Sequence, residues 1–131
     1  MPKKWTKREA FAELGAVCVN DRWSWSGRSA DQKTIVATCW QDEFYSKDGR
    51  MFYAWRGVDP ENPHARLGVA EMMENLTLAC ENCDGLFKVV VTIAKSRTSL
   101  KKEIAECFPS KMLMRVLYLD IEKAAFVAER V

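Results

Sequence analysis

The sequence predicts an α+β fold in which about three short helices accompany a mostly antiparallel curved sheet or a partly open β-barrel. Strand-like segments follow one another near both ends of the chain, and short helix-like segments lie between them. The chain has 131 residues, 48% of them hydrophobic, which suits one hydrophobic core near the commonest domain size. Because no linker-like or repeated segment divides it, residues 1–131 are expected to form a single domain.

In the first half, cap and turn residues set the expected boundaries. Thr6 and Glu9 have capping-box spacing, which predicts a helix over residues 7–14. Apolar or alternating stretches predict strands over residues 16–19, 23–26 and 34–40. The Lys-Asp-Gly-Arg segment at 47–50 predicts a hairpin between residues 44–45 and 51–55.

In the second half, helical spacing and one long apolar run are the main signals. Asn62 followed by Pro63 is typical of a helix start, and apolar residues from Val69 to Cys83 then share one helical face. The nearly continuous apolar segment 86–94 predicts a central strand. Two further elements are expected, a helix capped by Ser99 and ended by Pro109, and a last hairpin of residues 112–119 and 125–131.

Charge and cysteine content narrow the class of protein. The chain carries 20 basic and 18 acidic residues, a net charge of +2, which argues against coating duplex nucleic acid by electrostatics alone. Five cysteines at irregular spacing make a poor disulfide framework. No signal-peptide pattern and no apolar run of about 20 residues is present, so a cytoplasmic protein without a membrane partner is expected.

Aromatic residues are concentrated between positions 23 and 55, which hold more than half of those in the chain. In a strand, Trp23 and Trp25 would share one face, where indole rings can stack on a planar base, while Ser24 and Ser26 would share the other. The alternative is that these aromatics fill a core. The predicted ligand-binding residues are Trp23, Ser24, Trp25, Ser26, Trp40, Tyr45 and Trp55.

A basic segment at residues 95–102 combines cations and hydroxyls where a helix is expected to begin. Free backbone N–H groups at such an end favour an anion, so phosphate contact is predicted there, the alternative being an ordinary solvated loop. Arginines 22, 28, 50 and 56 flank the aromatic residues. The predicted phosphate-binding residues are Arg22, Arg28, Lys95, Arg97, Ser99, Lys101 and Lys102.

The remaining motifs favour structural roles. Cys80 and Cys83 have metal or redox spacing, but no second pair exists and both fit the apolar stripe of the helix. His64 is the single histidine, with no defined partner. Asp31 and Lys33 have a spacing used by some metal-dependent nucleases, which require a further acid. No catalytic residue, metal or cofactor is assigned.

The layout resembles that of the PUA-like superfamily, which includes the EVE, YTH, ASCH and SRA domains. The likeness rests on the Trp-Ser-Trp-Ser segment at 23–26, on Trp40 and on the strand 85–94, Gly-Leu-Phe-Lys-Val-Val-Val-Thr-Ile-Ala. The resemblance implies capture of a modified or flipped base, with Trp23, Trp25 and Trp40 as the pocket and Ser24 and Ser26 as edge readers.

These features favour a non-enzymatic nucleic-acid-binding module that captures a plain or modified base, with single-stranded or modified nucleic acid as partner. One alternative is a protein-interaction or oligomerising domain, including a homodimer, that uses the aromatic surface. Another is a small nuclease or nucleotide-acting enzyme working through Asp21, Asp31, Lys33 or His64. A small-molecule-binding barrel remains a further alternative.

Overall fold

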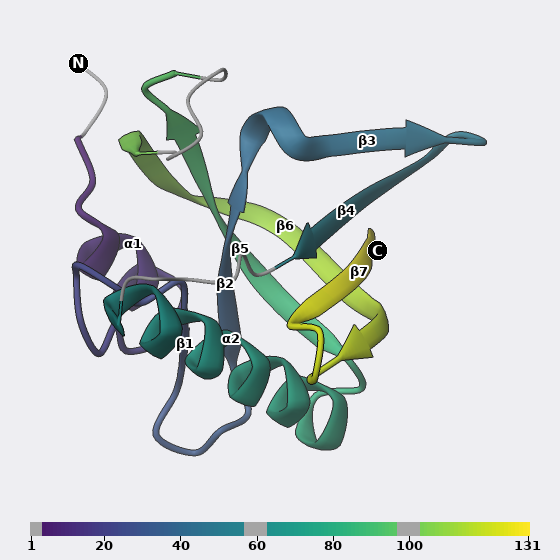
Figure 1. The fold of residues 1–131 in the computed structure, drawn as a ribbon, viewed down its shortest axis with the longest axis horizontal. Helices are drawn as coiled ribbons and strands as arrows, with labels where there is room; N and C mark the ends of the chain where they lie inside the picture. The colour runs from purple at the N-terminus through teal and green to yellow at the C-terminus, as the bar shows by residue number, and fades with distance from the viewer. Residues whose placement is uncertain (1–3, 57–62, 97–102) are drawn as a thin grey trace.

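The computed structural model describes residues 4–56, 63–96 and 103–131, which form an α+β fold on one mixed sheet (Figure 1). This part of the chain contains two α-helices, a short 3-10 helix and seven strands. The helices are α1 (Lys7–Glu13), η1 (Gln41–Glu43) and α2 (Pro63–Asn82). The strands are β1 (Ser26–Arg28), β2 (Ile35–Trp40), β3 (Phe44–Lys47), β4 (Arg50–Arg56), β5 (Leu86–Ala94), β6 (Ile104–Asp120) and β7 (Ala125–Arg130).

The sheet is open and almost entirely antiparallel. Its strand order is β1-β2-β5-β6-β7-β4-β3, and among these pairings β2–β5 is the parallel one. The two edges, β1 and β3, do not meet, so the described strands do not close into a barrel. The β3–β4 hairpin extends away from both helices, toward the upper right of Figure 1.

The two α-helices pack on opposite faces of the sheet. Met72, Met73 and Leu76 of α2 belong to one cluster of buried residues with Val89 of β5. The adjacent Val90 belongs to a second cluster, which contains Ala10 and Phe11 of α1. Because successive side chains of a strand point to opposite faces, α1 and α2 lie on different sides. Among the described strands, this second cluster includes residues of β2, β5 and the first part of β6.

Most of the predicted elements are confirmed. Helix α1 begins with the expected capping box, in which the Thr6 hydroxyl accepts a 3.1 Å hydrogen bond from the Glu9 amide. The β3–β4 and β6–β7 hairpins form at their predicted turns, and β5 covers the predicted range in the interior of the sheet. Asn62, the expected cap of α2, lies outside the described residues.

The two strands expected at residues 16–19 and 23–26 do not form as predicted. Only Val17 of the first makes a bridge, to Arg28, and the second is replaced by a turn followed by β1. Asn20 explains the turn, since its carbonyl accepts from the Ser24 amide at 2.9 Å and its side chain accepts from the Arg22 amide at 2.8 Å. Such local hydrogen bonds compete with a strand ladder. Trp23 and Trp25 are therefore not neighbours on one face of a strand.

The prediction of a third helix, ended by Pro109, is also wrong. Residues from Ile104 onward belong to the long strand β6. Cys107 joins the α1-side cluster and Phe108 packs on the α2-side cluster, so these two residues follow the alternation of a strand. Pro109 is tolerated inside the sheet because it lies at an irregularity, where the β5–β6 register shifts between Lys88 and Val90. The expected cap, Ser99, lies outside the described residues.

The apolar face of α2 differs in detail from the predicted stripe. Ala79 is fully buried whereas Cys80 is exposed, so the buried face turns away from Cys80 at the end of the helix. None of the helices in the described residues is both long and apolar enough to cross a membrane.

Candidate nucleic-acid interface

The aromatic residues between positions 23 and 55 divide between the two faces of the sheet. Phe44, Tyr53 and Trp55 lie on the α2 side, within or against the larger buried cluster. Tyr45 and Phe52 alternate with them along β3 and β4, so they point to the opposite face. The cluster that is continuous in the sequence is therefore two groups in space.

On the α2 side the aromatic rings mainly build the core. The rings of Trp25 and Trp40 are 6.0 Å apart, and Trp40 is only 8% exposed. The Trp40 amide donates a 3.0 Å hydrogen bond to the hydroxyl of fully buried Tyr53. Trp55 packs against Phe126 with ring centroids 5.8 Å apart. These contacts support the interpretation of this group as core.

The two serines of the Trp-Ser-Trp-Ser segment are fully buried and hydrogen-bonded within the chain. The Ser24 hydroxyl accepts a 3.0 Å hydrogen bond from the Asn20 amide. The Ser26 hydroxyl accepts one of 2.8 Å from the side-chain amide of Asn75 on α2. Both hydroxyls thus hold this loop in place and do not face solvent.

Half-buried Trp25 lies beside a polar cluster drawn from α1, the 20–25 loop and α2. The Lys7 ammonium is 5.2 Å from the centre of the Trp25 ring and donates a 2.7 Å hydrogen bond to the Ser24 carbonyl. Burial lowers the pKa of Lys7. Burial likewise raises the pKa of Glu71, opposed by a hydrogen bond from Ser24, and one carboxyl oxygen of Glu71 is buried without a partner. Because the Lys7 ammonium lies 5.2 Å from the ring centre, Lys7 occupies part of the space over the Trp25 ring.

The opposite side of the sheet carries an exposed aromatic stack. Tyr45, which is 43% exposed, stacks on Phe52 with ring centroids 5.5 Å apart and an interplanar angle of 23°. The Arg50 guanidinium lies 5.4 Å from the centre of the Phe52 ring and forms an ion pair with Glu129. The Phe52 ring is therefore in contact with both Tyr45, on the edge strand, and Arg50.

The same side continues across β7 to the second part of β6. Phe52 is opposite Glu129, and Glu129 is opposite Arg115. Further along β6, Tyr118 is 52% exposed and is paired with Val127. We call the surface formed by Tyr45, Arg50, Phe52, Arg115 and Tyr118 the aromatic face. The cluster around α1 does not include it.

Of the predicted phosphate-binding residues, Arg22, Arg28 and Lys95 lie in the described part of the chain. Arg22 is exposed, whereas Arg28 forms a 2.9 Å ion pair with Glu74 of α2. Lys95 pairs with Glu103 at 3.5 Å. Arg97, Ser99, Lys101 and Lys102 lie outside the described residues.

Two of the side chains considered for catalysis, Asp21 and Asp31, interact with neighbours in the chain. Asp21 pairs with Arg8 at 2.9 Å. Asp31 accepts hydrogen bonds of 2.5 Å from the Ser29 hydroxyl and 3.0 Å from the Lys33 amide, which lower its pKa. His64 belongs to α2.

All five cysteines are free thiols. The Cys83 thiol donates a 3.2 Å hydrogen bond to the Lys33 carbonyl, and burial raises the pKa of both Cys80 and Cys83. No group of three or more metal-binding side chains occurs in the described part of the chain.

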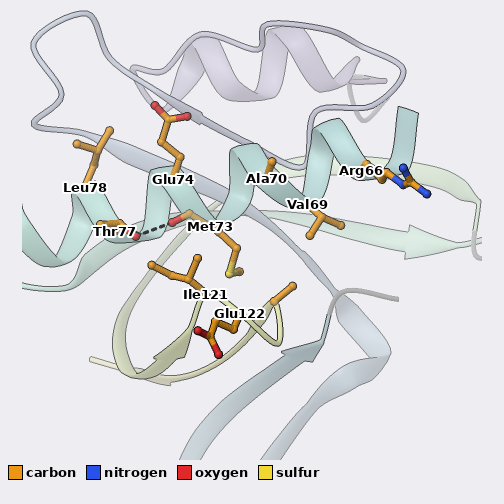
Figure 2. Close-up of a pocket in the computed structure, with 10 residues that line it drawn as sticks. Arg66, Val69, Ala70, Met73, Glu74, Thr77, Leu78, Ile121 and Glu122 are labelled. Carbon is orange, nitrogen blue, oxygen red and sulfur yellow. Dashed lines mark hydrogen bonds between the residues drawn. The ribbon is translucent and has the colours of Figure 1, made fainter. Parts of the chain in front are cut away.

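An apolar groove lies elsewhere, between α2 and the turn that joins β6 to β7 (Figure 2). Its volume is about 580 Å³, and its walls come from one side of α2 and from residues 121–124. None of the aromatic residues predicted from the sequence lines it.

Tyr45 is among the site residues predicted from the sequence, whereas Phe52, Arg115 and Tyr118 are not. The hairpin signal at 47–50 fixes the pairing of Tyr45 with Phe52, so this contact was available from the sequence. Arg115 and Tyr118 join the face only through the long-range pairing of β4 with β7 and of β7 with β6, which has no local signal.

Comparison with models of known protein families, with curated proteins and with solved structures found no match.

Proposed function

We propose that this chain is a non-enzymatic module that binds single-stranded nucleic acid by stacking unpaired bases on the aromatic face. The observation that carries the proposal is the contact of the Phe52 ring with Tyr45 and Arg50, on a part of the α1 side of the sheet that the α1 cluster does not reach. Every base has a π-face, and a stacked base contributes about 1–3 kcal/mol to binding.

Two separated rings suit an extended strand of nucleic acid. Tyr118 is paired across β7 with the row of Ala54, two residues along β4 from Phe52. With strands about 4.8 Å apart and about 3.4 Å per residue, Tyr118 and Phe52 have Cα atoms about 12 Å apart. One base cannot span that separation, so the two rings would take different bases of the same strand.

The charges of this side also favour a nucleic-acid backbone. Lys47, Arg56 and Arg115 are exposed, while the carboxylate of Glu129 is already paired with Arg50. A net charge of only +2 disfavours long-range attraction to a duplex and leaves stacking as the main source of affinity.

Capture at the aromatic face replaces the closed pocket expected around Trp23, Trp25 and Trp40. Lys7 lies over the Trp25 ring and Trp40 is almost fully buried, so a base would have to displace native contacts there. The PUA-like assignment belongs to the same proposal and is supported by the layout alone, an open sheet with a helix on each side. A cytoplasmic location is supported by five free cysteines, which suit a reducing compartment.

Fluorescence anisotropy with labelled 12-nucleotide single strands of DNA and RNA, and with a matched duplex, tests the proposal. Tyr45→Ala should weaken single-strand binding by about 5- to 100-fold, because it removes one stacking position. Tyr45→Phe should retain most of the affinity. Leu67→Ala, at an exposed position on α2, is the control and should leave it unchanged. Absence of binding at about 100 µM protein in low salt, or tighter binding to the duplex, would overturn the proposal.

A further inference from the structure

The groove between α2 and the β6–β7 turn combines an apolar floor with an apolar projection. Met73 lies at its floor and is 4% exposed, between Val69 and Leu78 along the helix (Figure 2). Ile121, on the opposite wall, is 60% exposed. An apolar side chain this exposed beside an apolar depression is typical of a surface that another molecule covers.

One exposed ridge of α2 along this groove carries charges that would match those of the same ridge in a second, antiparallel copy. Arg66, Ala70 and Glu74 are spaced four residues apart, so they follow one ridge of the helix, and all three are exposed. Arg66 and Glu74 are about 12 Å apart along the helix axis, with Ala70 midway between them. A two-fold axis through Ala70 would place Arg66 of each copy opposite Glu74 of the other, and the small alanine lets the helices approach. Glu74 also pairs with Arg28, which orients its carboxylate.

We infer that this groove is the interface of a symmetric homodimer, in which two α2 helices pack antiparallel and each Ile121 covers the groove of the other copy. A two-fold interface requires one patch that matches itself, and the Arg66–Ala70–Glu74 ridge meets that requirement. The molecule that occupies the groove is a second copy of this chain, because the complementary charges of α2, the exposed Ile121 and the groove itself all lie on one surface. The inference does not depend on nucleic-acid binding.

Sedimentation velocity on the full chain at about 5–200 µM tests the oligomeric state. The protein should sediment at twice its monomer mass of 15.0 kDa in the upper part of this range. Arg66→Glu and Glu74→Arg should each raise the dimer dissociation constant at least tenfold, since each places like charges against one another. Lys47→Glu, the same kind of charge reversal on the distant β3–β4 hairpin, should leave it unchanged.

Mixing the two charge-reversal variants gives the decisive result. The Arg66→Glu chain and the Glu74→Arg chain present complementary ridges, so the mixture should dimerise although neither variant does so alone. Circular dichroism of each variant checks that the fold is retained. A wild-type protein that stays monomeric at 200 µM, or a mixture that stays monomeric while both variants are folded, would overturn the inference.

Discussion

Tyr45 and Trp25 differ in what lies over their rings, since the Tyr45 ring is partly open to solvent and the Trp25 ring is partly covered by Lys7. Tyr45 stacks on Phe52 from the edge strand and is 43% exposed. Trp25 has Lys7 5.2 Å from its ring centre and Trp40 6.0 Å away. Aromatic residues that are equivalent in the sequence therefore have different roles, set by the alternation of the strands and by contacts from α1.

Glu71 makes the stability of the protein depend on pH in a predictable direction. Burial raises the pKa of Glu71 above its ordinary value of 4.5, so the folded chain holds this proton more tightly than the unfolded chain. The stability linked to Glu71 is therefore greatest below about pH 4.5 and falls as the pH rises through the folded pKa. Lys7, Arg28 and Glu74 contribute smaller charge effects.

Glu71→Gln should remove this loss of stability. In urea denaturation, the free energy of unfolding of the variant minus that of the wild type should be larger at about pH 7 than at about pH 4. Glu122→Gln, which removes an exposed carboxyl, is the control for the change in net charge. A difference between Glu71→Gln and wild type that is the same at both pH values would contradict the assignment of a raised pKa.

Among the elements, α2 and the 23–25 loop approach each other closely at Gly68. A Cβ atom on Gly68 would lie 2.1 Å from the Trp23 carbonyl oxygen and 2.5 Å from the Trp25 ring. Glycine weakens the interior of a helix, so its presence in α2 is explained by this close approach rather than by helix propensity.

Gly68→Ala should therefore destabilise the protein although alanine favours helix. The expected loss is about 1–3 kcal/mol in the free energy of unfolding, as for other overpacked sites. Chemical denaturation measures it, with Ala70→Gly at an exposed position of the same helix as the opposite exchange. At a protein concentration too low for two α2 helices to pair, that control should cost about 1 kcal/mol through propensity alone. A Gly68→Ala variant more stable than wild type would show that the helix and the loop are not in close contact.

The elements that could be predicted from the sequence are those with local signals. The capping box of Thr6 and Glu9, the turn at 47–50 and the apolar run 86–94 each act within a few residues, and each is confirmed. The third helix failed because the spacing of Ile104, Cys107 and Phe108 fits a helix, while their burial in the structure is decided by pairing with β5. Local spacing cannot report a partner that is distant in sequence.

The same limit, that local signals do not report long-range contacts, applies to the prediction of the candidate site. Tyr45 could be predicted as part of an aromatic surface, and its contact with Phe52 follows from a local hairpin. The burial of Ser24 and Ser26 could not, because it depends on the 20–25 turn and on Asn75 from α2. A strand register that differs by one residue moves each side chain to the other face of the sheet. The face that a side chain occupies is therefore decided by the tertiary structure.

For the whole molecule, the two proposals concern different surfaces of one sheet. The aromatic face lies on the α1 side, and the groove lies along α2 on the other. A dimer formed through α2 therefore leaves both aromatic faces open, and two copies can engage one long strand of nucleic acid. Such a pair of sites raises the apparent affinity without any new contact, provided that the strand spans both.

The most direct test of nucleic-acid binding is a ¹H–¹⁵N correlation spectrum recorded during titration with a short oligothymidine. Amide shifts should concentrate on β3, β4, β7 and residues 113–120 of β6, while amides of residues 23–25 and of α2 stay in place. Shifts confined to residues 23–25 and the first half of α2 would contradict the aromatic face as the binding surface. No shifts at saturating oligonucleotide would contradict nucleic-acid binding itself.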